Sequence, residues 1–191
     1  MVLIGLSGKA RSGKDAVADT CVSAYGWRKF KLADPLKKIT RDIFGLSMAH
    51  TDGDLKEKPL GPGAITPREL MISVGKLGRS VEPNFWVNRL RDDLLKTPQA
   101  QMGTYIIADV RFINEAEWIK KHGGFLVRLE RAVELRGGDI DDRSETELDD
   151  YEGFHLKIGE SWNVDAKDLP AICERIQELV EVRSASPFFN R

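Results

Sequence analysis

The first twenty residues contain the feature that most limits how this chain can fold. Val2 to Leu6 form a continuous apolar run, which predicts a strand buried on both faces. The glycine-rich segment GKARSGKD, Gly8 to Asp15, follows almost at once, and from Lys14 the apolar residues recur at helical spacing. A buried strand, a glycine-rich loop and a helix in this order predict a phosphate-binding loop, in which backbone N–H groups and a helix N-terminus face an anion.

Lys14 completes the loop spacing, in which two glycines are separated by four residues and followed directly by a lysine. In such loops the lysine reaches the terminal phosphates of a nucleotide. The alternative is a glycine-rich turn that binds nothing. The position between a buried strand and a helix favours the phosphate-binding interpretation.

Asp15 stands where this motif ordinarily has Ser or Thr, whose hydroxyl group binds Mg²⁺. A carboxylate is also a hard oxygen ligand, so we predict that Asp15 holds Mg²⁺ directly or through water. Its charge beside a triphosphate would be offset by the metal or by Arg11. The alternative is an acidic residue in the first helical turn, stabilised by the helix dipole.

A second strongly apolar strand, Thr104 to Asp109, ends in an acid. In open parallel sheets, ligands collect at the carboxyl ends of the strands, so we predict Asp109 as a second residue that organises Mg²⁺. Arg111 lies at the same edge. The alternatives are that Asp109 caps the next helix and that Arg111 forms a surface ion pair.

Several arginines follow predicted strand ends or lie in the charged segment after residue 130. Phosphoryl transfer between two anionic phosphates needs positive charge, and the guanidinium fork matches phosphate oxygens. The segment 131–150 contains a Gly-Gly pair and is predicted to form a lid over the site. Any single arginine is equally compatible with a solvated surface position. The group is Arg68, Arg79, Arg128, Arg131, Arg136 and Arg143.

Strand-like and helix-like segments alternate along the chain, which predicts an α/β fold with helices on both faces of a five-stranded parallel sheet. We interpret residues 1–191 as a single domain. Within it, residues 46–65 have no periodicity and are predicted to be a mobile insertion, and residues 183–191 are expected to fray.

Helix starts in the middle of the chain have local signals. Asp34-Pro35 predicts a helix with Asp34 as its N-cap, and Thr66 to Glu69 has the spacing of a capping box, in a helix expected to end at Gly78. The first helix is expected to bury Ile43 and Phe44, and the second Leu77. A further helix after Asn84 carries the apolar stripe Trp86, Val87, Leu90 and Leu94.

Composition limits the classes of partner. Lys and Arg total 29, Asp and Glu total 30, and the net charge is -1 at pH 7. This balance predicts no general attraction to nucleic acid or to an anionic membrane, so anion binding must be local. Without an apolar run of membrane-spanning length or a recognisable signal peptide, a cytoplasmic location is expected. Cys21 and Cys173 are expected to be buried thiols in a reducing compartment.

Blocks of sequence in a fixed order resemble the deoxynucleoside monophosphate kinases of tailed phages, over roughly residues 2–180. The blocks are LSGKARSGKDAVAD, Leu32 to Lys37, Arg68 to Met71, Phe85 to Val87, and Asp109 to Glu115. Animal-type phosphomevalonate kinases share part of the set, including the Gly-Lys-Asp loop and the Asp-x-Arg sequence. The phage family is the closer overall resemblance.

The resemblance implies a P-loop NTPase fold with a lid, and ATP- and Mg²⁺-dependent phosphorylation of a nucleoside 5′-monophosphate to the diphosphate. It implies ATP contacts at Gly8, Lys9, Ala10, Arg11, Ser12, Gly13, Lys14, Asp15 and Ala16. It implies catalytic roles for Lys14, Arg11, Arg111, Arg131 and Arg136. The residues expected on the acceptor side are Asp34, Lys37, Arg68, Arg79, Trp86 and Arg111.

Two alternatives remain at this stage. One is a kinase acting on a phosphorylated non-nucleotide such as phosphomevalonate, and the other is a nucleotide-dependent switch without transfer chemistry. Aromatic stacking from Trp86 or Phe85 would favour a base in the acceptor pocket. The expected partners are small nucleotides, neither nucleic acid nor membrane, in the host cytoplasm for a phage-encoded protein. Homodimer formation, the preferred base and the preferred sugar stay open.

Overall fold

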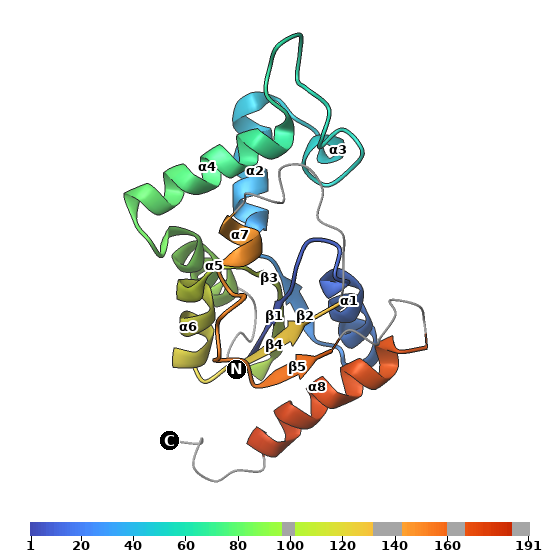
Figure 1. The fold of residues 1–191 in the computed structure, drawn as a ribbon. Coiled ribbons are helices and arrows are strands. Elements are labelled where there is room, and N and C mark those ends of the chain that lie inside the picture. Colours follow the sequence, from blue (N-terminus) through green and yellow to red (C-terminus); the bar gives the residue numbers. More distant parts are fainter. Residues whose placement is uncertain (97–101, 132–142, 160–166, 185–191) are drawn as a thin grey trace. The chain divides into compact units, whose positions relative to one another are not determined.

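The computed structural model describes residues 1–96, 102–131, 143–159 and 167–184 (Figure 1). The chain divides into two compact units. The first consists of Met1–Phe30 together with Pro98–Arg191, and the second of Lys31–Thr97. The first unit is built on a sheet and the second from helices. The interpretation of the whole chain as one kinase domain stays a prediction.

A five-stranded parallel sheet forms the centre of the first unit. Its strands lie in the order β2-β3-β1-β4-β5, and all four pairings among them are parallel. This confirms the sheet predicted from the alternating pattern, with the first strand of the chain in the middle. The strands are β1 (Val2–Ser7), β2 (Arg28–Phe30), β3 (Thr104–Val110), β4 (Phe125–Leu129) and β5 (Leu156–Ile158).

Helices cover both faces of this sheet, as predicted. Figure 1 shows α1 (Lys14–Tyr25) and α8 (Leu169–Ser184) on one face and α6 (Ile113–Lys121) on the other. Ile4 and Leu6 of β1 join a fully buried cluster with residues of α1 and α8. Gly5 points the other way, and a Cβ atom there would lie 2.7 Å from the Ile119 side chain of α6. The alternation of β1 side chains therefore fixes which helices lie on which face.

The two cysteines lie in the interface between α1 and α8. Both are buried free thiols, as predicted, and the Cys21 thiol donates a hydrogen bond of 2.8 Å to Cys173 Sγ. This hydrogen bond, together with burial, raises the pKa of the Cys21 thiol. The sequence did not indicate that the two residues are neighbours, because 152 positions separate them.

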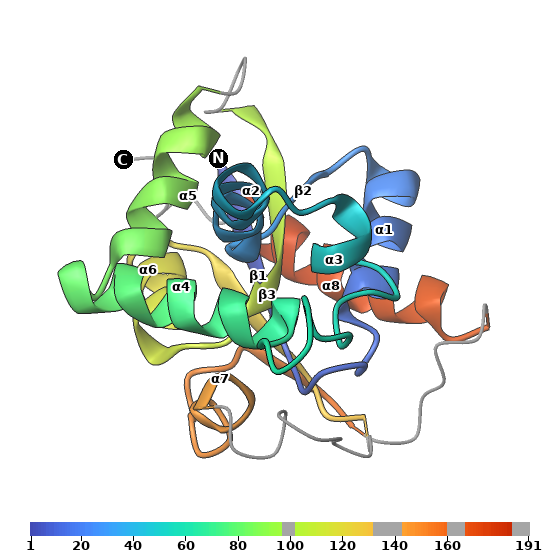
Figure 2. The ribbon, with the colours of Figure 1, turned by 90° about the horizontal axis from the view of Figure 1, so that it is seen from above.

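The described part of the second unit, residues 31–96, contains four helices, which Figure 2 shows from above. The helices α2, α4 and α5 all contact one another. The predicted capping box begins α4, where the Glu69 N–H donates to Thr66 Oγ1 at 3.2 Å and the Thr66 N–H donates to Glu69 Oε2 at 2.7 Å. The helices are α2 (Ala33–Phe44), α3 (Met48–Thr51), α4 (Pro67–Val81) and α5 (Phe85–Leu95).

The predicted start of α2 was wrong by two residues. The N-cap is Leu32, and Asp34 lies in the first turn. The backbone is already helical at Leu32, and the Asp34 N–H donates to the Lys31 carbonyl oxygen at 3.3 Å. Asp34 is therefore an acidic residue in the first turn, where its carboxylate is stabilised by the positive end of the helix dipole.

Gly78 does not end α4, which continues to Val81. A Cβ atom at Gly78 would lie 2.8 Å from the Trp86 ring, so the glycine makes room for that side chain inside the helix. Trp86 and the rest of the predicted α5 stripe are buried. Leu77, Ile43 and Phe44, by contrast, were expected to point inward and are exposed.

The segment 46–65, predicted to be irregular, contains the single-turn helix α3 followed by turns. Its mobility stays a prediction. Among the described residues, α8 is the longest helix, with 16 residues. No helix in the described ranges combines the length and the apolar character needed to cross a membrane.

The first unit's core gives a stability prediction. Ile176 of α8 is 0% exposed, whereas Ile43 of α2 is 69% exposed. Replacing Ile176 by Ala should lower the free energy of unfolding by about 2–5 kcal/mol, because it removes buried methyl groups and leaves a cavity. Ile43→Ala is the matched control and should change it by less than about 0.5 kcal/mol. Urea unfolding measures both, and equal effects would contradict the core assignment.

Candidate functional site

The loop between β1 and α1 curls tightly at the carboxyl end of the central strand. Gly13, the N-cap of α1, has a φ of 93°, and Gly8 has a φ of 154°. A Cβ atom at Gly8 would lie 2.6 Å from Ser12 Oγ and 2.7 Å from the Leu129 carbonyl oxygen, so the loop has no room for a larger residue there. Arg11 has a φ of 61° and is the single non-glycine residue with positive φ among the described residues.

Lys14 fills the inside of this loop. Its Nζ donates hydrogen bonds to the carbonyl oxygens of Gly8 and Lys9, both at 2.7 Å, and to Ser12 Oγ at 3.3 Å. The residue is only 7% exposed. All three acceptors are neutral, so the ammonium group is buried with dipoles as its hydrogen-bond partners.

The pKa of Lys14 is lowered from 10.5 to about 7, mainly because burial disfavours the charged form. The Arg111 charge lowers this pKa further, whereas Asp109 and Asp15 raise it. A phosphate bound in the loop would favour the protonated form of Lys14 by the same Coulombic argument.

The end of β3 brings Asp109 and Arg111 to the edge of the loop, as predicted. Asp109 is half-buried within β3, and Arg111 is the first residue after the strand ends at Val110. Glu115 accepts hydrogen bonds from the N–H groups of Arg111, at 2.8 Å, and Phe112, at 3.1 Å. These bonds hold the backbone that carries the Arg111 side chain.

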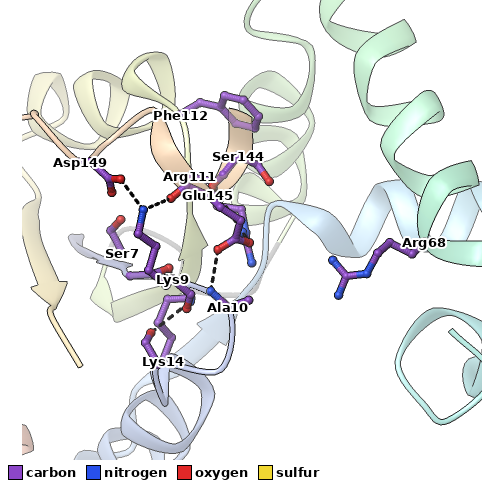
Figure 3. A network of polar contacts seen from close by, with 12 residues as sticks. Ser7, Lys9, Ala10, Lys14, Arg68, Arg111, Phe112, Ser144, Glu145 and Asp149 are labelled. Carbon is purple, nitrogen blue, oxygen red and sulfur yellow. Dashed lines mark hydrogen bonds and ion pairs between the residues drawn. The ribbon is translucent and has the colours of Figure 1, made fainter. Parts of the chain in front are cut away.

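Glu145 of α7 (Arg143–Thr146) places its carboxylate on the loop, as Figure 3 shows. The Ala10 N–H donates to Glu145 Oε2 at 2.6 Å, and Arg111 forms an ion pair with the same carboxylate. Lys9 Nζ donates to the Glu145 carbonyl oxygen at 2.6 Å. No sequence motif marks this residue.

Arg128, one of the arginines predicted to supply positive charge for phosphates, also lies in this polar network. It lies near the end of β4, is almost fully buried, and donates to Ser7 Oγ at 2.9 Å and to Asp149 Oδ1 at 2.6 Å. Lys9 forms an ion pair with the same Asp149 (Figure 3). In the sequence Arg128 stands out as the arginine of the otherwise apolar strand FLVRL. No comparable pattern marks Glu145 or Asp149.

Asp15 lies in the first turn of α1, with a side chain that is 58% exposed. Its Oδ1 is 2.7 Å from Lys29 Nζ, which also contacts Asp19 Oδ1 at 2.8 Å. No group of three or more His, Cys, Asp or Glu side chains suited to a metal occurs in the described ranges. The predicted Mg²⁺ roles of Asp15 and Asp109 therefore stay predictions.

The remaining predicted acceptor residues belong to the helical unit. Asp34 is exposed, Lys37 forms an ion pair with Asp52, and Arg68 Nε is 2.5 Å from Glu57 Oε1. Each of these side chains lies on or near the start of a helix. Their binding roles stay predictions.

Trp86 is engaged in helix packing. Its Nε1 donates to the Gly75 carbonyl oxygen at 3.0 Å, and its ring lies against Gly78. Phe85 contacts it edge-on, with ring centroids 4.8 Å apart, and is the more accessible of the two. Arg79 is half-buried in α4, and Arg131 is half-buried just after β4. Arg136 and most of the predicted lid, residues 132–142, lie outside the described residues.

Comparison with known proteins connects this site with one family. A family model described as deoxynucleotide monophosphate kinase matches residues 2–58. A protein of Acanthamoeba polyphaga mimivirus, provisionally described as a deoxynucleotide monophosphate kinase, is 33% identical over 147 residues, covering 69% of this chain and 75% of the viral protein. The deoxynucleotide monophosphate kinase of Enterobacteria phage T4 is 38% identical over 77 residues, covering 40% of this chain and 32% of that protein.

Solved structures resemble the chain in fold. Shikimate kinase from Acinetobacter baumannii, solved with shikimate, has a TM-score of 0.50 at 13% identity, covering 97% of this chain and 96% of that one. TT1252 from Thermus thermophilus has a TM-score of 0.51 at 17% identity, covering 93% and 97%. At these identities the likeness concerns fold alone, and it confirms the predicted α/β fold of the P-loop kinase type.

The buried Lys14 gives a prediction about pH. Unfolded chains hold this proton up to the ordinary pKa of 10.5, whereas the folded protein releases it near 7. Between these values the unfolded state binds more protons, so the free energy of unfolding should rise with pH, by at most about 1.4 kcal/mol per pH unit. A Lys14→Met variant lacks the group and should lack this contribution.

Urea unfolding of both proteins across that pH range gives the difference between their free energies of unfolding at each pH. The contributions of the other titrating groups are common to both proteins and cancel in this difference. Parallel pH profiles for the two proteins would show that the Lys14 ammonium group carries no burial penalty.

Proposed function

The chain belongs to the deoxynucleotide monophosphate kinase family, and on that premise we propose that it transfers the γ-phosphoryl group of ATP to a (deoxy)nucleoside 5′-monophosphate, giving the diphosphate. The observation that carries the proposal is the curled loop after β1, with Lys14 buried at its centre. A cation held in this way next to a helix N-terminus is suited to an anion with several charges.

In this proposal the loop binds the phosphates of ATP. Turns with αL residues at Arg11 and Gly13 expose successive backbone N–H groups, which form an anion-binding concavity. Lys14 exchanges its carbonyl partners for phosphate oxygens, and Arg11 adds charge on the loop. Arg111 supplies a guanidinium group from the end of β3.

The transfer step needs no general base, because the attacking oxygen of the acceptor phosphate is already anionic. The protein therefore contributes position and positive charge. Charge spreads over the oxygens of the transferred group in the loose transition state, and Lys14 and Arg111 are the residues proposed to stabilise it. Arg131 and Arg136 are proposed to act from the lid.

The acceptor is proposed to contact the helical unit through the residues that the family resemblance implies. Lys37, Arg68 and Arg79 provide positive charge for its phosphate. The packing of Trp86 leaves Phe85 as the aromatic ring better suited to contact a base. The names of the relatives favour a nucleotide acceptor, and they favour neither phosphomevalonate nor a non-catalytic switch.

Asp15 and Asp109 would hold Mg²⁺. Two carboxylates fit this ion, since Mg²⁺ is usually bound by one or two carboxylates together with substrate phosphates and waters. Both residues are near enough to Lys14 to raise its pKa. When bound, Mg²⁺ supplies positive charge to the phosphate oxygens. The exposed side chain of Asp15 would exchange its contact with Lys29 for this role.

The direct test is a coupled assay of ADP formation with ATP and the four common deoxynucleoside 5′-monophosphates. We expect phosphorylation of at least one of them. Lys14→Ala should lower kcat by about 100-fold or more, as expected when one donor to a developing charge is removed. Lys157→Ala removes an exposed lysine of β5 and should keep the wild-type rate. No ADP with any acceptor would overturn the proposed activity.

Asp15 gives a separate prediction about Mg²⁺. Asp15→Ala should raise the Mg²⁺ concentration needed for half-maximal rate by about tenfold, because a ligand or its water contact is lost. Asp19→Ala is the matched control, since Asp19 contacts the same Lys29 one turn further along α1. It should leave the Mg²⁺ dependence unchanged. Equal responses of the two variants would assign Asp15 to the first helical turn alone.

A further inference from the structure

The donors expected to hold nucleotide phosphate are already occupied by a side chain of the same unit. The Glu145 carboxylate accepts the Ala10 N–H at 2.6 Å and pairs with the Arg111 guanidinium group. Figure 3 shows this carboxylate directed at the loop from α7. Glu145 is only 5% exposed, although its ordinary preference as a charged residue is for the surface.

A carboxylate in this position imitates a phosphate. Both groups are anions whose oxygens accept hydrogen bonds from backbone N–H groups and match the arginine fork. Ala10 belongs to the loop that binds phosphates in the proposed function, and Arg111 belongs to its catalytic set. An oxygen of Glu145 and an oxygen of a phosphate cannot both take the same N–H at 2.6 Å.

The contact is supported by further bonds to the same loop. Lys9 Nζ donates to the Glu145 carbonyl oxygen at 2.6 Å and also pairs with Asp149. Arg111 Nη1 lies 3.4 Å from the Ser144 carbonyl oxygen. Burying a carboxylate is costly unless charge and hydrogen bonds compensate it, and here they do. The charge and hydrogen-bonding capacity of the buried Glu145 carboxylate are therefore satisfied within the protein itself.

We propose that Glu145 is an internal competitor for the phosphate loop, which occupies the Ala10 N–H and Arg111 until a nucleotide phosphate displaces it. The proposal rests on the proposed function only in naming nucleotide as the displacing anion. Binding of ATP then requires Glu145 to leave the loop, so the affinity for ATP is set by a competition between two anions.

The competition has a measurable size. When a protein must leave one state before it can bind, the apparent dissociation constant rises by the inverse of the fraction that is ready to bind. If Glu145 occupies the loop in about nine molecules of ten, its removal should tighten ATP binding about tenfold. The effect should be the same for any anion that uses these donors, including inorganic tripolyphosphate.

The experiment is calorimetric titration of ATP, without acceptor, into the wild-type protein and into Glu145→Gln and Glu145→Ala variants. Glutamine keeps the size of the side chain and removes its charge, so that variant remains informative if Glu145→Ala folds poorly. We expect both variants to bind ATP about tenfold more tightly. Glu147→Gln makes the same change two residues along, where the carboxylate accepts the Ile113 N–H at 3.1 Å, and should bind like the wild type.

Unchanged or weaker ATP binding by both Glu145 variants overturns the proposal and makes Glu145 a residue that positions Arg111. A lower kcat with an unchanged dissociation constant leads to the same conclusion. Because binding is measured without an acceptor, the result is independent of the transfer reaction. Tighter binding in a protein that phosphorylates no monophosphate would support the competitor and reject the proposed activity.

Amide hydrogen exchange at Ala10 provides a second readout. In the wild-type protein the Glu145 bond should slow this exchange. In Glu145→Ala the exchange should be faster without ligand and slow again on addition of ATP. Exchange at Ala10 that is the same in wild type and variant would contradict the contact itself.

Discussion

The hydrogen bonds from the Lys14 ammonium group to the carbonyl oxygens of Gly8 and Lys9 hold the phosphate loop in its curled form. In a peptide unit the C=O and N–H groups point in opposite directions. Drawing two carbonyl oxygens toward the inside of the loop therefore turns the adjoining N–H groups away from that cation. The burial that places the Lys14 ammonium group inside the loop also lowers the pKa of Lys14, so the shape of the loop and the charge of this residue are linked.

Sequence was sufficient for the parts of the site that depend on local order. The apolar runs of β1 and β3 predicted buried strands, and the spacing from Gly8 to Lys14 predicted the loop that connects β1 to α1. The sequence could not reveal Glu145, because 135 positions separate this residue from its partner Ala10. Glu145 also lies in a charged segment that has no periodic pattern. Only the pairing of β1 with β3 and β4 brings these distant segments to one edge of the sheet.

Tertiary packing also overruled a local signal in the helical unit. Glycine often ends a helix, so Gly78 was expected to end α4. In the structure the missing side chain accommodates the Trp86 ring, and the helix continues for three more residues. The same Trp86 ring was predicted to line the acceptor side; its N–H donates to the Gly75 carbonyl oxygen, and its binding role stays a prediction. A tryptophan near an expected site can thus be explained by the packing of its own helix pair.

The arginines predicted as positive charge for phosphates are paired with carboxylates in the structure. Arg68 contacts Glu57, Arg111 contacts Glu145, and Arg128 contacts Asp149. When an arginine exchanges a carboxylate for a phosphate, an anion compensates its positive charge both before and after the exchange. On the proposed function, the free energy of phosphate binding would be a difference between two anions, and the greater charge and additional oxygens of the phosphate would favour the exchange. The carboxylates would then hold the positive charge in position, and they would set how strongly an incoming phosphate must interact to replace them.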